Sequence, residues 1–299
     1  MNLIIESGAT KADWTIIGDD GGIRSFQTDG LNFSSGDEEF VFRTLESAAI
    51  KVLDMTDAEV IDEVDLYAAG LFFSEDPQSP YQLLENSLSN RFPGAAIFLE
   101  NDLLAAARAL FGNRPGIACI LGTGSNACLY DGTSIIRKTS SGGFILGDEG
   151  GAAALGRIFI SDLIKGLVPE CVALAFKEKY DLDYPEIVRQ VYHGASPAAY
   201  LGKFAPDILA FYDTNPYMHR LVDDNFRAFI ERCILCIFSA REALKLEIDA
   251  GSRLPVGAIG GFAFACREIL ESVAGEEGIS FESVLKSPSE RLIEYHSTK

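Results

Sequence analysis

Two short loops of small residues could hold phosphate groups. The first is Gly8-Ala9-Thr10-Lys11 and the second is Gly122-Thr123-Gly124-Ser125, and each directly follows an apolar run. Small residues let backbone N–H groups approach an anion closely, and hydroxyl groups add further donors. Neither loop is the common P-loop, because a strand rather than a helix is expected to follow each one. One such loop alone is more often a hairpin turn, so the presence of two is the informative observation.

A single carboxylate, Asp102, could act as a general base. It stands where a predicted strand, residues 95–99, is followed by a predicted helix, residues 102–110. Ligands of open α/β sheets gather at the carboxyl ends of strands, where a carboxylate could take the proton of a hydroxyl that attacks phosphorus. The alternative is structural, because Asp is a favoured helix N-cap. Taken alone, Asp102 is better explained as a helix cap. The presence of the two loops favours the interpretation of Asp102 as a general base.

The densest glycine motif surrounds two adjacent carboxylates, Asp148 and Glu149. Five of the ten residues from 142 to 151 are glycine. Such a segment allows a ligand to come close, and the carboxylates could bind sugar hydroxyls or orient Mg²⁺ through water. A tight turn with favourable charge at the start of the next helix is the alternative. Residues 256–262 are a weaker motif: a predicted strand ends there in glycines, and the flat, hydrophobic base of a nucleotide could lie against them.

The elements that must position these motifs occur twice as one pattern. Each copy predicts a strand, a small-residue loop, a second strand, an Asp-Gly turn and a third strand. The predicted strands cover residues 3–5, 14–17 and 23–28 in the first copy and residues 117–121, 127–130 and 134–138 in the second. A repeated unit with facing loops would place one ligand between two domains. Chance similarity of two three-stranded meanders is the alternative.

The chain is long enough for two domains. It has 299 residues, of which 47% are hydrophobic, so each half can bury a core. A break of turn residues at 112–116 marks the expected boundary. We therefore expect domains at residues 1–114 and 115–287, with a helical insertion at about residues 165–250 in the second.

Charge and composition exclude several classes of function. A net charge of −19 disfavours nucleic acid and anionic lipid as partners, although backbone N–H groups can still hold a nucleotide phosphate locally. No N-terminal signal and no apolar stretch of membrane-spanning length is visible, so we expect a cytoplasmic protein. The six cysteines lie mostly in apolar surroundings and predict reduced core residues.

On these motifs the chain resembles the N-acetylglucosamine kinase and BadF–BadG–BcrA–BcrD ATPase family of the actin–hexokinase–heat-shock ATPase superfamily. The likeness covers nearly the whole chain and rests on residues 6–14, 121–126, 146–150 and 257–262. It implies an α/β fold of two ribonuclease H-like domains of the actin/hexokinase type, each with a mixed five-stranded sheet, and a ligand cleft between them. It also implies that the final helix, near Leu292, packs on the first domain.

The resemblance implies transfer of the ATP γ-phosphate to a hydroxyl, usually the 6-OH, of N-acetylglucosamine or a related amino sugar. Asp102 would then be the general base. The nucleotide contacts would be Ser7, Gly8, Thr10, Lys11, Gly122, Thr123, Gly257, Gly260 and Gly261. The sugar contacts would be Asn32, Asp102, Ser125, Asn126, Gly143 and Asp148. The expected partners are a small-molecule sugar and a nucleotide, with a homodimer left open.

Two positions depart from the family pattern. The family usually has Asp at the first position of its first motif, where it helps to hold Mg²⁺ through water, and this chain has Glu6. The longer side chain changes the reach of the carboxylate. Phe144 replaces a Trp that usually follows the Gly pair, so the identity of the sugar stays open.

Two other functions fit the same resemblance. BadF-type relatives include activators that reduce a partner enzyme through a shared iron–sulfur cluster, which needs exposed cysteines. Cys233 and Cys236 form a C-x₂-C pair, but their apolar neighbours favour packing in the core. The second alternative is a non-catalytic sugar or nucleotide sensor, which the change at Glu6 keeps open and the retained Asp102 argues against.

Overall fold

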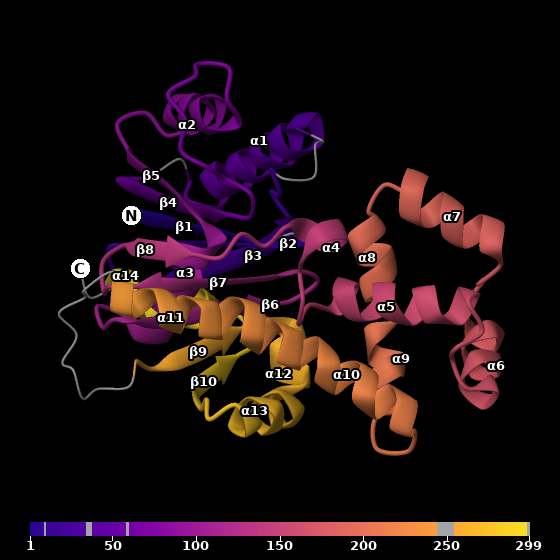
Figure 1. The fold of residues 1–299 in the computed structure, drawn as a ribbon. Coiled ribbons are helices and arrows are strands. Elements are labelled where there is room, and N and C mark those ends of the chain that lie inside the picture. The colour runs from indigo at the N-terminus through magenta and orange to yellow at the C-terminus, as the bar shows by residue number, and fades with distance from the viewer. Residues whose placement is uncertain (9, 34–37, 58–59, 244–253, 298–299) are drawn as a thin grey trace. The chain divides into compact units, whose positions relative to one another are not determined.

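The chain folds into two compact units. The computed structural model describes residues 1–299 except 9, 34–37, 58–59, 244–253 and 298–299. Unit 1 comprises Met1–Gly112 and Pro288–Lys299, and unit 2 comprises Asn113–Ser287 (Figure 1). Each unit has its own five-stranded sheet and its own hydrophobic core. The predicted α/β fold with two mixed five-stranded sheets is therefore confirmed.

The sheet of unit 1 has the strand order β3-β2-β1-β4-β5. The first three strands form an antiparallel meander, whereas β4 and β5 run parallel to β1. The strands are β1 Asn2–Ser7, β2 Lys11–Ile17, β3 Ile23–Asp29, β4 Glu63–Ala68 and β5 Ala96–Asn101. The helices are α1 Glu38–Met55, α2 Pro80–Arg91, α3 Asp102–Phe111 and α14 Ser289–Ser297. In α1 the buried side chains recur every three or four residues, which gives one apolar face.

The last helix of the chain, α14, belongs to unit 1. It packs against α3, and its Leu292 and His296 are buried there. The chain therefore leaves unit 1 after Gly112, builds unit 2, and returns.

The sheet of unit 2 repeats the topology of unit 1. Its order is β10-β9-β6-β7-β8, with an antiparallel meander followed by two parallel strands. The strands are β6 Gly116–Leu121, β7 Ser125–Tyr130, β8 Ile135–Lys138, β9 Val256–Ile259 and β10 Phe281–Leu285. The repeated meander predicted from the sequence is thus present in both units.

Helices occupy most of the chain between β8 and β9. They are α4 Gly143–Leu146, α5 Ala152–Ile164, α6 Glu170–Lys179, α7 Tyr184–His193, α8 Pro197–Gly202, α9 Ala205–Ala210, α10 Pro216–Phe229, the π-helical segment η1 Ile230–Leu235 and α11 Cys236–Ala243. After β9 come α12 Gly261–Ala265 and α13 Arg267–Glu276. The sequence predicts one helix over residues 262–274, but the backbone leaves the helical region at Cys266, with φ −107° and ψ 20°.

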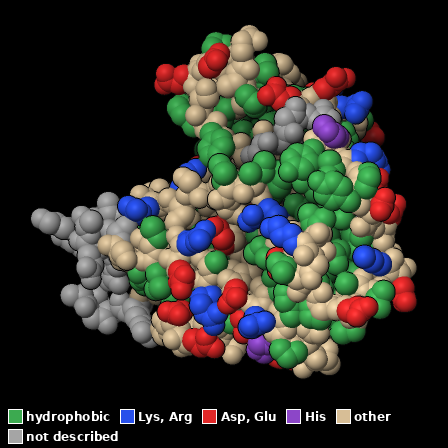
Figure 2. Space-filling model, turned by 45° about the vertical axis from the view of Figure 1, so that its right-hand side comes forward, with side chains coloured by type: hydrophobic (Ala, Val, Ile, Leu, Met, Phe, Trp, Pro, Cys, Tyr) green, Lys and Arg blue, Asp and Glu red, His purple; other side chains and the backbone are tan. Residues whose placement is uncertain are grey.

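The structure shows how charged side chains are distributed on one face and which cysteines are buried. The face in Figure 2 carries acidic and basic side chains interspersed with apolar ones, although the net charge is −19. Cys171 and Cys236 are exposed, so the prediction of core cysteines is correct only for the other four. Within the described part of the chain, no helix combines the length and the apolar character that a membrane span requires.

Candidate active site

The parallel strands of unit 1 bring separate motifs to one edge of the sheet. Ser7 of β1 lies beside Ala68 of β4, and Ala68 lies beside Asn101 of β5. All three strands end at these residues. The first loop, which follows Ser7, and Asp102, which follows Asn101, therefore leave the sheet at its carboxyl edge, where α/β proteins bind ligands.

The N-cap of α3 is Asn101, not Asp102. The Asn101 backbone is extended, and its Oδ1 accepts a hydrogen bond from the N–H of Leu104 at 3.0 Å. Asp102 is the first helical residue and is half-buried. The capping interpretation of Asp102 is therefore wrong, and helix capping does not account for a carboxylate at this position.

Three carboxylates of unit 1 influence one another near this edge. Glu6 lies beside Asp13 in the β1–β2 register. Burial, together with the negative charges of Asp13 and Asp102, raises the pKa of Glu6 to about 8, against the opposing effect of Lys11. Asp13 is held by Lys11 Nζ at 3.0 Å and by Gln27 Nε2 at 2.6 Å. Sequence reasoning missed Asp13, although strand alternation places it on the same face as Lys11.

These carboxylates fit a magnesium ion. Mg²⁺ prefers oxygen donors and usually keeps several of its waters, so a longer carboxylate can serve through water. Burial, and then the negative charges of Asp13 and Asp102, raise the pKa of Glu6, so a positive charge beside this carboxylate would favour its ionised form. A divalent cation here would supply that positive charge.

The first loop is tied to the segment that carries Asn32. The Ser7 hydroxyl is buried, accepts the N–H of Leu31 at 2.6 Å, and donates to the carbonyl of Gly8 at 3.3 Å. Phe33 donates its N–H to Ala69 at 3.1 Å. Ser7 therefore positions the half-buried Asn32 segment rather than presenting its hydroxyl to solvent.

The remaining residues of the first loop differ in their surroundings. A Cβ built at Gly8 would meet no heavy atom within 4 Å, so close packing does not explain the glycine. Thr10 is exposed, and the exposed Lys11 side chain is paired with Asp13. Ala9, which belongs to the same predicted loop, lies outside the described residues.

In unit 2 the second loop is fastened to the start of α5. The carbonyls of Gly122 and Thr123 accept the N–H groups of Ala152 at 2.9 Å and Ala153 at 2.8 Å. Within the described ranges, no acceptor is found for the N–H groups of Thr123 and Gly124. Carbonyls engaged by a helix and N–H groups turned elsewhere are the arrangement expected of an anion-binding loop.

The glycine-rich motif folds over this loop. Asp148 is buried and has a left-handed backbone with φ 56°, which is uncommon for a residue other than glycine. Its Oδ1 accepts the N–H of Ser125 at 3.3 Å, and a Cβ at Gly124 would lie 2.7 Å from its Oδ2. Burial raises the pKa of Asp148, partly offset by Ser125 and Arg157. The structure thus brings together Ser125 and Asp148, two predicted sugar contacts.

Asn225 holds the same motif from α10. It is only 2% exposed, its Oδ1 accepts the N–H of Gly150 at 3.1 Å, and its Nδ2 donates to Gly151 at 3.4 Å. Arg232 Nη1 also pairs with Glu149 Oε1 at 2.5 Å. Sequence reasoning missed both residues, because no local pattern links a helix to a loop some 75 residues earlier.

Three other predicted residues have distinct places. Gly143 opens α4 with φ 65°, and a Cβ there would meet no heavy atom within 4 Å. Asn126 lies in β7, where its Oδ1 accepts the N–H of Ala127 at 2.9 Å. Gly257 is buried inside β9, paired on both sides, and does not reach the end of the strand.

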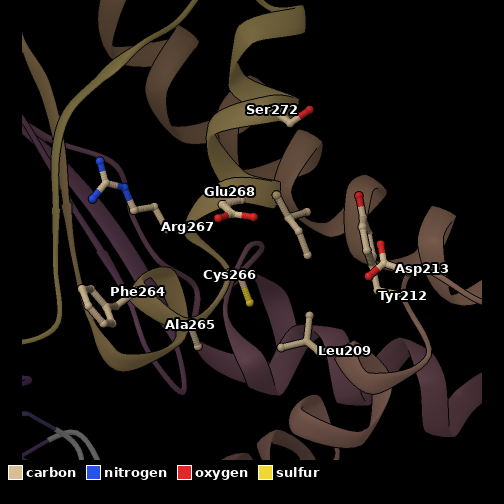
Figure 3. Close-up of a pocket in the computed structure, with 10 residues that line it drawn as sticks. Leu209, Tyr212, Asp213, Phe264, Ala265, Cys266, Arg267, Glu268 and Ser272 are labelled. Atoms are coloured by element: carbon tan, nitrogen blue, oxygen red, sulfur yellow. The ribbon is translucent and has the colours of Figure 1, made fainter.

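The end of β9 lies against the second loop. A Cβ at Gly260 would stand 2.2 Å from the carbonyl oxygen of Leu121 and 3.3 Å from the nitrogen of Gly122. Gly261, with open space around it, then begins α12. A hollow with a volume of about 700 Å³ lies where α12 meets α13 (Figure 3). It is lined by Leu209, Tyr212, Asp213, Phe264, Ala265, Cys266, Arg267, Glu268, Ile269 and Ser272.

The cysteine pair offers little to a metal cluster. Cys233 is buried, and burial raises the pKa of its thiol to about 11, which disfavours the thiolate that ligates iron. Among the residues that the structure describes, the one group with metal-ligand spacing contains no cysteine.

Comparison with known proteins agrees with the fold. A scan against protein-family models finds no match, and a search of curated proteins finds none either. Among solved structures, a candidate N-acetylglucosamine kinase from Porphyromonas gingivalis is 38% identical, over 100% of this chain and 99% of its own, with a TM-score of 0.85.

Two more distant structures share the fold. A candidate N-acetylglucosamine kinase from Chromobacterium violaceum is 18% identical over 98% of both chains, with a TM-score of 0.70. A ROK hexokinase from Thermus thermophilus is 18% identical over 99% of this chain and 97% of its own, with a TM-score of 0.54. This chain is 38% identical to the Porphyromonas gingivalis protein over its full length, and its two sheets share one topology. It therefore belongs to the N-acetylglucosamine kinase family, among the sugar kinases of the actin–hexokinase–heat-shock ATPase superfamily.

Proposed function

We propose that the protein transfers the γ-phosphate of ATP to the 6-hydroxyl of N-acetylglucosamine or a related amino sugar, with Asp102 as general base. The observation that carries the proposal is the carboxyl edge of the sheet in unit 1. Asp102 stands there in a row with the first loop, and Asn101 has taken over the capping of α3. The 38% identity to the Porphyromonas gingivalis protein supports the sugar class.

The reaction needs one proton transfer from the chain. Asp102 accepts the proton of the sugar hydroxyl as its oxygen bonds to the γ-phosphorus. The bond between that phosphorus and the bridging oxygen breaks, and ADP leaves with the electron pair. Phosphoryl transfer of this kind depends mainly on positioning and on electrostatic stabilisation, which the loops supply.

The nucleotide is assigned to the second loop and the β9–α12 junction. The N–H groups of Thr123 and Gly124 would donate to phosphate oxygens. The base would occupy the hollow where α12 meets α13, whose lining combines apolar side chains with Tyr212, Asp213 and Glu268 (Figure 3). Its polar side chains could donate hydrogen bonds to the nitrogen atoms of the base or accept hydrogen bonds from them, and its apolar side chains could pack against the ring.

The sugar is assigned to the motif around Asp148. The buried carboxylate of Asp148 accepts a hydrogen bond from Ser125 at 3.3 Å, and a carboxylate has room to accept further hydrogen bonds from sugar hydroxyls. Asn225 and Arg232 hold the motif in place through a hydrogen bond to Gly150 and an ion pair with Glu149. Asn32, Asn126 and Gly143 are assigned as further contacts.

Glu6, with Asp13 and Asp102 nearby, would hold Mg²⁺, through water in the case of Glu6. Bound Mg²⁺ would neutralise charge on the phosphates. Without the ion, the raised pKa of Glu6 means that this side chain is largely protonated at neutral pH.

The test is an assay of ADP release over a panel of amino sugars, with parent and Asp102→Asn proteins. We expect turnover with at least one sugar and a loss of about 10²–10⁴-fold in kcat for Asp102→Asn, the usual worth of a general base. Asp54→Asn, an exposed change in α1 of the same unit, should leave the rate unchanged. An unchanged rate for Asp102→Asn would remove Asp102 from this role. Sugar binding without any turnover would favour the sensor instead.

A further inference from the structure

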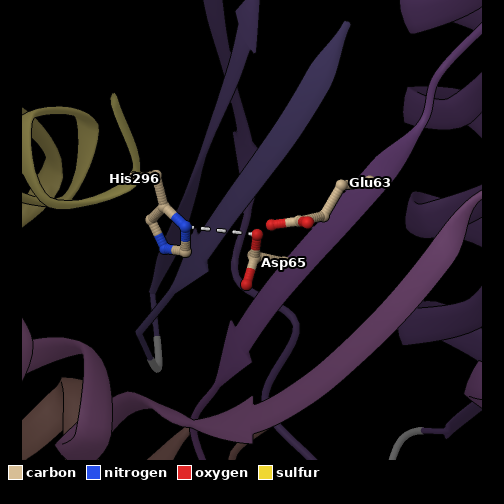
Figure 4. A group of neighbouring side chains, drawn as sticks. All are labelled: Glu63, Asp65 and His296. Atoms are coloured by element: carbon tan, nitrogen blue, oxygen red, sulfur yellow. Dashed lines mark ion pairs between the residues drawn. The ribbon is translucent and has the colours of Figure 1, made fainter. Parts of the chain in front are cut away.

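A group of three side chains in unit 1 lies apart from the proposed active site. Glu63 and Asp65 stand two residues apart on β4, so they project from the same face of the strand. The C-terminal helix α14 brings His296 to that face (Figure 4). One ligand atom from each of the three side chains lies within 4.8 Å of the other two. In the β1–β4 register Glu63 pairs with Asn2, at the opposite end of β1 from Ser7.

We infer that Glu63, Asp65 and His296 form a binding site for one Zn²⁺ ion. Nδ1 of His296 is 3.3 Å from Oδ2 of Asp65. Two ligands of a tetrahedral zinc ion, with bonds of about 2.0–2.1 Å, stand about 3.3–3.4 Å apart. The pair therefore already has the spacing of neighbouring zinc ligands.

The other side of the imidazole is fixed as a zinc ligand requires. Nε2 of His296 is 2.9 Å from the hydroxyl of Tyr67, which also accepts a hydrogen bond from Arg108 Nη1 at 2.6 Å. A metal-bound histidine usually donates its second N–H to a fixed acceptor, and that bond orients the ring. With the proton on Nε2, Nδ1 presents its lone pair to the two carboxylates. With the proton on Nδ1, the same residues form a buried Asp–His pair without metal.

Burial and charge favour the ion. The side chains of His296 and Asp65 are 1% and 3% exposed, and Glu63 adds a second carboxylate beside them. Carboxylates removed from water are costly unless a cation compensates them. An imidazole nitrogen in the donor set selects Zn²⁺ over Mg²⁺ and Ca²⁺, which take oxygen ligands. Glu63 is only half-buried, so an ion can reach the site from solvent.

The expected role is structural. The ligands join the last helix of the chain to a strand of the sheet in unit 1, so the ion would fasten α14 in place. The site uses no residue of the proposed kinase chemistry, and its test does not depend on that proposal.

The experiment is a calorimetric titration of chelator-treated, full-length protein with Zn²⁺, followed by Co²⁺ substitution and its visible spectrum. We expect one ion per chain and no displacement by millimolar Mg²⁺ or Ca²⁺. Glu63→Gln and His296→Gln should each weaken Zn²⁺ binding at least about tenfold, as even outer-shell changes do at zinc sites. Zn²⁺ should raise the melting temperature of the parent and much less that of Glu63→Gln.

His219→Gln is the matched control. His219 Nε2 is also 3.3 Å from a carboxylate oxygen, that of Asp223, but this pair lies in unit 2 and is more exposed. The variant should bind Zn²⁺ as the parent does. If the parent shows no stoichiometric binding, or if Glu63→Gln binds Zn²⁺ unchanged, the inference is overturned and Asp65–His296 is a buried pair without metal. Glu63 is only half-buried, so Glu63→Gln should fold and can decide the test even if His296→Gln fails to fold.

Discussion

Glu6 shows how its neighbours, rather than its residue type, decide what a side chain can do. A free glutamate is ionised at neutral pH, whereas burial and the adjacent Asp13 and Asp102 raise the pKa of Glu6 to about 8. The carboxyl group at the position that departs from the family pattern therefore holds its proton more tightly than a free glutamate does. Binding of a cation there would release the proton.

This shift predicts a pH-dependent stability. The unfolded chain loses the Glu6 proton near pH 4.5 and the folded chain near pH 8. Between these values the folded state binds more protons, so the free energy of unfolding falls as pH rises, by up to about 1.4 kcal/mol per pH unit. Glu6→Gln has no proton to lose, so its stability relative to the parent should increase between pH 5 and 8.

Urea denaturation of both proteins at pH 5, 6.5 and 8, without divalent cations, measures this difference. The two proteins should be most alike at pH 5. A stability difference that does not change with pH would show that Glu6 has an ordinary pKa.

At the scale of elements, strand ends and helix starts assemble the proposed nucleotide site. β6 and β9 are parallel neighbours, so the second loop and the Gly260 turn emerge side by side. The start of α5 binds the loop carbonyls and fixes the direction of the loop N–H groups. Two glycines at this edge have different surroundings. A side chain at position 260 would clash with the backbone of Leu121, whereas a Cβ at position 122 would meet no heavy atom within 4 Å.

Gly122→Ala tests whether that open space is used. A Cβ at Gly122 meets no heavy atom within 4 Å, so the variant should fold. The added methyl group would stand where a phosphate must approach the backbone, and we expect KM for ATP to rise at least about tenfold with KM for the sugar little changed.

Gly275→Ala is the control for this substitution. Gly275 lies in the helix α13, and a Cβ there also meets no heavy atom within 4 Å. Alanine at this position, in the last turn of the helix, should be tolerated and should leave both KM values unchanged. Equal KM values for ATP in the Gly122→Ala and parent proteins would remove the second loop from phosphate binding.

At the scale of the whole molecule, the path of the chain makes unit 1 depend on both termini. Unit 2 is one continuous segment, whereas unit 1 is completed by α14 from the end of the chain. Leu292 is fully buried, and the Arg108 guanidinium lies over the ring of Tyr295 at 5.4 Å. Removal of α14 would expose the face of α3 that it covers.

Truncation after Ser287 should therefore destabilise unit 1 and spare unit 2. The single tryptophan of the chain, Trp14, is buried in the core of unit 1, so its fluorescence reports on that unit. With a chelator present throughout, we expect the fluorescence midpoint of thermal unfolding to fall by at least about 5 °C, while circular dichroism retains a later transition from unit 2. A fluorescence midpoint equal to that of the full chain would contradict this.

Local patterns in the sequence determined the two meanders, the small-residue loops, the strand that leads to Asp102 and the glycine motif around Asp148. Apolar alternation, turn residues and glycine clusters act over a few neighbouring residues, so they can be recognised without a structure. The tertiary structure alone decided that Asn101 rather than Asp102 caps α3, that Asp13 faces Glu6, that Asn225 holds the Asp148 motif and that His296 lies against Asp65. Strand register and helix docking bring these partners together, and neither is encoded in the few residues around each partner.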